Sequence, residues 1–141
     1  MTSSTDSPYR SSRGTILVVE DNPEVRNVAV GQLRTLGYAV VEAENASVGL
    51  SVLRSQQRVD LLFTDVVMPG GMTGLELGHE AQRIRPGLPV LYTSGFADTT
   101  FPQEEEFLAR TVMLPKPYRI RDLARKVEDA MSADHMSDPR R

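Results

Sequence analysis

The alternation of two hydrophobic patterns is the feature that most constrains the fold of this chain. Short apolar runs, rich in β-branched residues, recur five times, and each predicts a β-strand. These runs cover residues 15–20, 38–42, 59–64, 88–93 and 111–114. Three of them are apolar on both faces, which is typical of a parallel sheet covered by helices on two sides.

Apolar residues at helical spacing fill the segments between the predicted strands. The first predicted helix ends at Gly37, the second begins after a capping Asn45, and the third ends before Pro86. The clearest apolar stripe comes last and contains Ile120, Leu123, Ala124, Val127, Ala130 and Met131. Residues 97–110 contain Pro102 and an acidic run, so they predict only a short or irregular helix.

Five successive β-α repeats predict right-handed crossovers and an α/β, doubly wound fold. The expected architecture is a flavodoxin-like (βα)5 domain with a parallel five-stranded sheet in strand order 2-1-3-4-5. Residues 14–131 form this domain. Small and polar residues dominate 1–13 and 132–141, which are therefore predicted to be disordered tails.

Composition excludes several classes of function. The chain has 141 residues, a net charge of −3 and a pI near 5.4, which disfavours general binding to nucleic acid or to anionic membranes. It has no cysteine, which excludes disulfides, thiolate metal sites and cysteine nucleophiles. No apolar run approaches the roughly 18 residues that span a bilayer, and the N-terminus lacks the apolar core of a secretory signal. We therefore expect a cytoplasmic protein.

Polar side chains stand at the carboxyl ends of four predicted strands. Strand 1 ends in Glu20 and Asp21, strand 3 in Asp65, strand 4 in Ser94 and strand 5 in Lys116. Sites in open parallel sheets form beyond the carboxyl ends of the strands, where the strand order switches. If strands 1, 3, 4 and 5 are neighbours, these five side chains share one pocket.

The chemistry of such a pocket points to phosphoryl transfer. Three neighbouring carboxylates repel one another, and a hard cation such as Mg²⁺ relieves that repulsion with oxygen ligands and water. Lys116 offers a compact positive charge for a phosphate oxygen. Asp65 can then act as a nucleophile and form an aspartyl phosphate. The sequence therefore predicts a phosphoryl acceptor.

Four short motifs in this order resemble the receiver domain of two-component response regulators, a CheY-like fold. They are E-D-N at 20–22, T-D-V-V-M-P at 64–69, T-S-G at 93–95 and K-P at 116–117. The resemblance covers about residues 14–131. Each motif alone is weak, but four of them, in this order at four strand ends, are highly specific.

The resemblance implies a role for each site residue. Asp65 is the phosphorylated residue and also a Mg²⁺ ligand; Asp21 binds Mg²⁺ directly, and Glu20 binds it largely through water. The backbone carbonyl of Val67 is a further ligand.

The same resemblance implies that one hydroxyl and one ammonium group contact the phosphoryl group. Counting along strand 4 from Pro89 favours Ser94 over its neighbour Thr93 as the hydroxyl. Lys116 is implied to pair with the phosphoryl group, next to Pro117.

Three features depart from the commonest receiver pattern. Met113 stands where many receivers carry an aromatic switch residue, Gly95 replaces a common alanine, and the loop M-P-G-G-M-T-G is one residue longer than usual. These features are similar to receivers of hybrid histidine kinases and of single-domain regulators. They motivate the hypothesis that output runs through reordering of residues 97–110.

The expected function is a stand-alone response regulator that takes a phosphoryl group from a histidine kinase or a phosphotransfer protein. Its only catalysis would be its own phosphorylation and dephosphorylation. No effector is expected after Met131, so its output would come from docking to an unknown downstream protein. We expect a monomer or weak dimer. The alternatives are a receiver fragment of a hybrid kinase, a pseudo-receiver that binds partners without phosphorylation, and a Mg²⁺-dependent phosphohydrolase. Such hydrolases normally place a second aspartate where this chain has Val67.

The remaining aromatic and histidine residues leave other interpretations open. Tyr92, Phe96, Phe101 and Tyr118 fit either a partner-facing patch or core packing, and core packing suits Tyr92 well. His79 is expected to be solvated. Two histidines without cysteine predict no zinc cluster.

Overall fold

A parallel sheet lies between two layers of helices. The computed structural model describes residues 13–66, 72–94, 112–115 and 118–136. Its sheet has five strands in the order β2-β1-β3-β4-β5, and every neighbouring pair is parallel. This is the predicted α/β fold and strand order.

The strands occupy the predicted places, with small shifts at their ends. They are β1 (Thr15–Val19), β2 (Ala39–Ala43), β3 (Leu61–Asp65), β4 (Val90–Ser94) and β5 (Val112–Pro115). Two strands begin two residues later than predicted, because Val59 and Leu88 are buried in the core before the ladders start. A run of apolar residues alone therefore predicts the first residue of these two strands slightly too early.

Within the part of the chain that the structure describes, four helices connect and cover the strands. They are α2 (Pro23–Thr35), α3 (Ala46–Arg54), α4 (Gly74–Ile84) and α6 (Ile120–Met136). Asn22 caps α2 by accepting hydrogen bonds from the backbone N–H groups of Glu24 and Val25. Asn45 caps α3 in the predicted way by accepting from Val48 N–H at 2.9 Å.

The end of α6 differs from the predicted domain boundary. We expected a disordered tail from residue 132, but the helix continues to Met136. Residues 132–136 contain neither glycine nor proline, so each extends the helix at small cost. None of the helices in the described ranges is both long enough and apolar enough to cross a bilayer.

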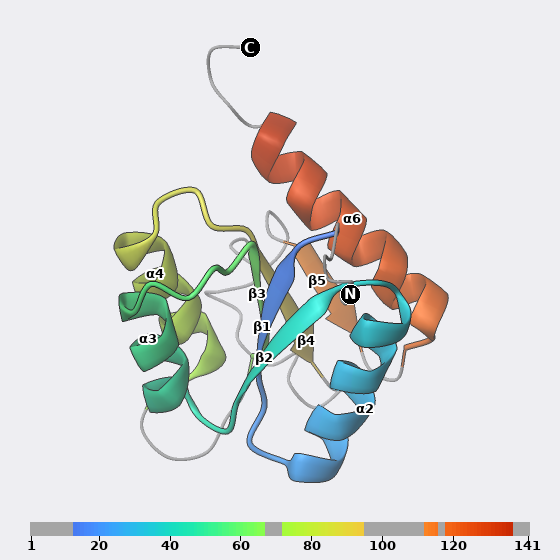
Figure 1. Ribbon diagram of the computed structural model, residues 1–141, viewed down its shortest axis with the longest axis horizontal. Helices are drawn as coiled ribbons and strands as arrows, with labels where there is room; N and C mark the ends of the chain where they lie inside the picture. The colour runs from blue at the N-terminus through green and yellow to red at the C-terminus, as the bar shows by residue number, and fades with distance from the viewer. Residues whose placement is uncertain (1–12, 67–71, 95–111, 116–117, 137–141) are drawn as a thin grey trace, which may run out of the picture.

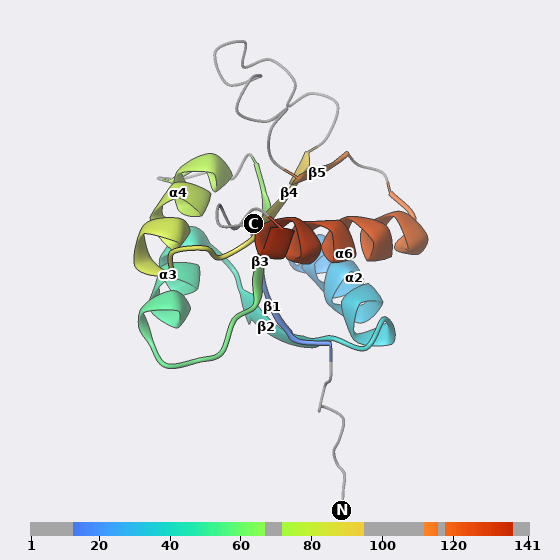
Figure 2. The same ribbon diagram turned by 90° about the horizontal axis from the view of Figure 1, so that it is seen from above.

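Each face of the sheet has its own core of buried side chains, and helices cover both faces (Figures 1 and 2). In Figure 2, α3 and α4 lie on one face of the sheet, and α2 and α6 lie on the other. The core on the α2/α6 face is built from alternate strand residues and from helix residues facing them. Among its members are Ile16, Val18, Leu61, Phe63, Leu91, Leu114, Leu33, Leu123 and Val127. The same alternation, continued past the last core residue of β1, β3 and β4, places the next side chains of this face in the candidate site.

Candidate functional site

Two buried carboxylates and a buried hydroxyl share one hollow at the carboxyl edge of the sheet. Asp65 ends β3 and Glu20 follows β1, and the two residues are 8% and 6% exposed. Both line a hollow on the α2/α6 face together with Thr93 of β4. Each stands two residues after an apolar core residue of that face, so strand alternation carries all three to the same side.

The structure thus brings together two of the predicted acidic residues. Carboxylates are rarely buried without pairing, because desolvation of the charge is costly. Their placement at the switch point, between β1 and β3, matches the expected position of a site in an open parallel sheet. Asp21 follows Glu20 directly and is exposed.

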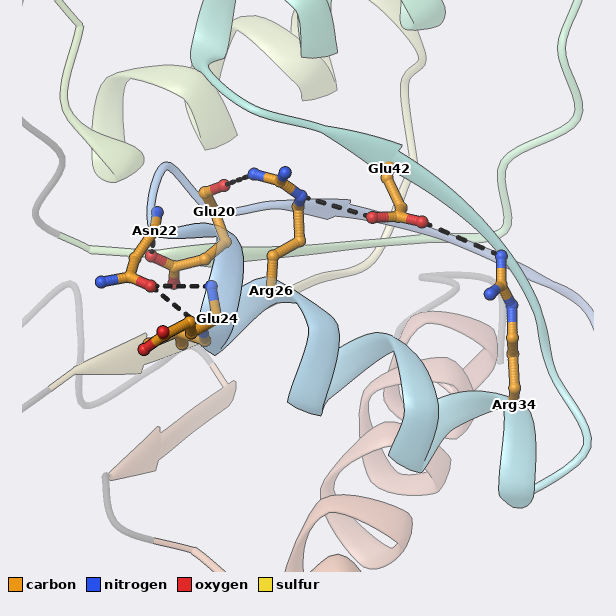
Figure 3. A network of polar contacts seen from close by, with 7 residues as sticks. Glu20, Asn22, Glu24, Arg26, Arg34 and Glu42 are labelled. Atoms are coloured by element: carbon orange, nitrogen blue, oxygen red, sulfur yellow. Dashed lines mark hydrogen bonds and ion pairs between the residues drawn. The ribbon is translucent and has the colours of Figure 1, made fainter.

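Figure 3 shows the contacts that hold the acidic turn, residues 20–22 directly after β1, in place. The backbone N–H of Asn22 donates to Glu20 Oε2 at 3.1 Å, which orients the carboxylate. Arg26 Nη1 donates to the backbone carbonyl of Glu20 at 2.7 Å, and Arg26 Nε donates to Glu42 Oε1 at 3.3 Å. Arg26 therefore ties the turn to strand β2. Sequence analysis missed this residue, whose only signal was a basic side chain one turn into α2.

The backbone around Asp65 is fixed by its neighbours on both sides. Val66 N–H donates to the carbonyl of Thr93 at 2.9 Å, and Gly74 N–H donates to the carbonyl of Val66 at 2.8 Å. The first residue of α4, Gly74, packs against the Asp65 carbonyl so closely that a Cβ there would collide with it. The start of α4 is therefore part of the support of Asp65.

Tyr118 is a site residue whose role the sequence left open. It lines the hollow, and its ring meets Phe63 edge-on, with 6.4 Å between the ring centroids. Burial, together with the negative charges of Glu20 and Asp65, raises the pKa of Tyr118 to about 12. Its hydroxyl thus lies in the field of both carboxylates. Tyr92, by contrast, is 2% exposed and belongs to the core, as expected.

The described part of the site fits a magnesium ion only in part. Within the described ranges, no three His, Cys, Asp or Glu side chains gather closely enough to hold a metal ion. Mg²⁺, however, commonly uses one or two carboxylates and takes its other oxygens from water and backbone. Glu20 and Asp65, which line one hollow, would supply two such carboxylates.

Several predicted site features lie outside the described residues. These are Val67, Lys116, the Gly-Gly insertion at 70–71, Gly95, Phe96, Phe101 and the segment 97–110. The side chains of Ser94 and Met113 are also outside it, although β4 and β5 include their backbones. The predicted roles of these residues stay predictions.

Comparisons with known proteins agree on one family. The family model described as "Response regulator receiver domain" matches residues 16–128. The response regulator receiver protein CpdR of Brucella abortus is 32% identical over 118 residues, which cover 84% of this chain and 97% of that protein. The sensor kinase CckA of the same organism is 33% identical over 122 residues, covering 86% of this chain and 13% of the kinase.

Solved structures show the same fold. The receiver domain from the hybrid histidine kinase CckA superimposes with a TM-score of 0.67 at 33% identity, covering 84% of this chain and 99% of that one. A receiver domain protein from Clostridium thermocellum gives a TM-score of 0.76 at 22% identity, over 87% of this chain and 98% of that one. The second likeness concerns the fold alone.

Proposed function

Because this chain belongs to the response regulator receiver domain family and is a module of two-component signalling, we propose that Asp65 is its phosphoryl acceptor. The family acts through signalling and not as true enzymes, and its members typically use Mg²⁺ and a histidine kinase. The observation that carries the proposal is the burial of Asp65 and Glu20 in one hollow at the carboxyl edge of the sheet.

The proposed step is a displacement at phosphorus. A carboxylate oxygen of Asp65 attacks the phosphoryl group of a phosphohistidine; an O–P bond forms and the P–N bond breaks. The leaving imidazole takes up a proton. The donor is a histidine kinase or a histidine phosphotransfer protein.

Five further groups would complete the site. Asp21, Glu20 and the Val67 carbonyl would hold Mg²⁺ together with Asp65; when bound, the ion neutralises charge on the carboxylates and phosphoryl oxygens. Ser94 would donate a hydrogen bond to the phosphoryl group, and Lys116 would pair with its charge. The hydrogen bonds from Asn22 and Arg26 to Glu20 support this assignment, because they hold the acidic turn in place.

We further propose that the receiver acts in the cytoplasm as a stand-alone regulator, as a monomer or weak dimer, with its domain spanning at least residues 14–131. The coverage of almost all of CpdR supports this assignment, whereas the match to CckA keeps a hybrid-kinase fragment as the alternative. Phosphorylation would shift the balance between two conformations and so control a downstream protein. The segment 97–110 would transmit this change.

The test is phosphorylation by a small-molecule phosphodonor in the presence of Mg²⁺. Mass spectrometry should detect one phosphoryl group per chain, on an adduct that is stable in acid and cleaved in base. Asp65→Asn should abolish the adduct, because the amide is not a nucleophile for this step. Asp129→Asn, which changes an exposed carboxylate of α6, should leave it intact.

Two results would contradict the proposal. An adduct that persists in Asp65→Asn would place the acceptor elsewhere. Hydrolysis of many phosphate esters per chain would instead favour the phosphohydrolase alternative.

A further inference from the structure

Tyr118 and Val25 separate the hollow behind the two carboxylates from solvent. Among the described residues that line the hollow, these two alone are not buried: Val25 is 37% exposed and Tyr118 is half-buried. Val25 stands in the first turn of α2, and Tyr118 stands two residues before the start of α6. Two side chains from different elements therefore form the rim of the hollow.

The interior of the hollow is apolar. Val18, Ala29 and Phe63 line it from the core of the α2/α6 face, and its accessible surface is almost entirely apolar. It has room for about one water molecule, but a buried water needs two to four polar partners. Such a hollow stays dry as long as its rim is closed.

The ring of Tyr118 is held firmly in this rim. It meets Phe63 edge-on, with 6.4 Å between the ring centroids and 65° between the ring planes. The next residue is fixed at the start of α6, because Arg119 N–H donates to Asp122 Oδ2 at 3.2 Å and the Arg119 carbonyl accepts from Leu123 N–H at 3.0 Å. The ring thus has support from both β3 and α6.

A dry hollow makes the charges of the two carboxylates costly. Glu20 and Asp65 both line it, and both are buried. Water solvates a site with two negative charges more strongly than the same site neutralised by a cation. Exclusion of water from this side therefore penalises the metal-free site more than the metal-bound one. Mg²⁺ keeps several waters of its own, so the hollow is too small to hold the ion itself.

We propose that the ring of Tyr118 is a water shield for the acceptor site: with Val25 it keeps the hollow behind Glu20 and Asp65 dry, and so raises the affinity of these carboxylates for a divalent cation. This inference rests on the proposed function, since it takes the two carboxylates as cation ligands. The apolar surroundings of a metal site control its access to solvent, and groups around the ligands commonly change metal affinity about 10–100-fold when removed.

The first test needs no metal. In a crystal structure of the wild-type protein the hollow should hold no water, whereas Tyr118→Ala should admit at least one. Tyr118→Phe keeps the ring and should leave the hollow dry. Water in the wild-type hollow, or a dry hollow in Tyr118→Ala, would overturn the shield.

The second test measures binding of Mg²⁺ to the unphosphorylated protein by NMR titration of backbone amides. Tyr118→Ala should raise Kd about tenfold, and Tyr118→Phe should stay within about twofold of wild type. Val127→Ala is the matched control, because it truncates a buried α6 side chain of the same core that is not among the described residues lining the hollow. It should lower Tm but leave Kd within about twofold.

The outcomes separate the shield from the proposed cofactor. An unchanged Kd in Tyr118→Ala, or an equal rise in Val127→Ala, would overturn the shield alone. An equal rise in Tyr118→Phe would assign the effect to the hydroxyl and also overturn it. No binding of Mg²⁺ by the wild-type protein would overturn the proposed cofactor together with the effect on affinity, while the crystal structures still decide whether Tyr118 keeps the hollow dry.

Discussion

At the scale of single residues, Arg26 is a largely buried cation that donates a hydrogen bond to the backbone carbonyl of Glu20. Its side chain is 17% exposed, and it joins the Glu20 carbonyl to the Glu42 carboxylate. The acidic turn therefore does not depend on a bound ion for all of its order. Arg34 contacts the same Glu42 at 4.0 Å but is 57% exposed, so it offers a matched comparison.

We expect Arg26→Met to weaken the site and Arg34→Met to leave it unchanged. Loss of the Arg26 hydrogen bonds should cost about 1.5–3 kcal/mol of unfolding free energy and reduce phosphorylation by a small-molecule donor. The exposed Arg34 pair should contribute less than about 1 kcal/mol. Urea unfolding and phosphoryl-adduct formation measure both effects. Equal losses in the two variants would mean that Arg26 acts only as surface charge.

Single side chains were also where prediction from sequence was least complete. The acidic residues were found because they interrupt apolar runs at strand ends. The face of the sheet on which the Thr93 side chain lies depends on the register of β4 against β3, in which Thr93 is the partner of Asp65. A slip of one residue would turn the Thr93 side chain to the other face. The contacts of Arg26 and Tyr118 join elements distant in sequence, and no local pattern contains them.

At the scale of elements, the junction between β3 and α4 determines where Asp65 can stand. Thr73 and Glu76 form a reciprocal capping box that fixes the first turn of α4. Gly74 then brings the helix backbone against the Asp65 carbonyl. Any side chain at this position would have to push the helix and the acceptor strand apart.

We expect Gly74→Ala to destabilise the protein by about 3 kcal/mol and to slow phosphorylation of Asp65. The added Cβ would collide with the backbone of the acceptor strand, which cannot move aside as a flexible side chain can. Gly31→Ala is the control. It lies in α2 with nothing within 4 Å of an added Cβ, and should stabilise by about 0.5–1 kcal/mol. Chemical denaturation distinguishes the two, and a neutral Gly74→Ala would show that α4 does not support the acceptor.

Elements were the level that the sequence predicted well. Asn22, Asn45 and Gly37 mark helix ends by local chemistry, so their positions could be found without knowledge of the fold. The end of α6 was missed because residues 132–136 have no strong signal for or against a helix. Strand starts were displaced where burial begins before the ladder.

At the scale of the whole molecule, both cores enclose tyrosine hydroxyls. Burial raises the pKa of Tyr92 to about 12, and burial, together with Glu20 and Asp65, does the same for Tyr118. Burial also raises the pKa of Tyr38, although the Arg13 guanidinium above its ring opposes that shift. The folded protein therefore keeps these phenols protonated at pH values where an unfolded chain ionises them.

This difference predicts alkaline unfolding with a defined sign. Free tyrosine has a pKa of about 10, so the stability linked to these groups is fully present below about pH 10. It should fall as pH rises from about 10 to about 12, because the unfolded chain releases the protons first. Urea midpoints across this range measure the loss, and Tyr92→Phe should flatten it. An identical pH dependence in Tyr92→Phe would show that this phenol does not govern the transition.

The ion pairs around Glu42 have a further consequence for self-association. Strand β2 is an edge of the sheet and reads A-V-V-E-A, so its outer backbone groups are open to pairing with another chain. Glu42 is the charged residue in that strand, and Arg26 and Arg34 hold it there. The Arg26 contacts that secure the acidic turn thus also keep a charge on a sheet edge that is open to intermolecular β-pairing, which links the order of the site to the solubility of the protein.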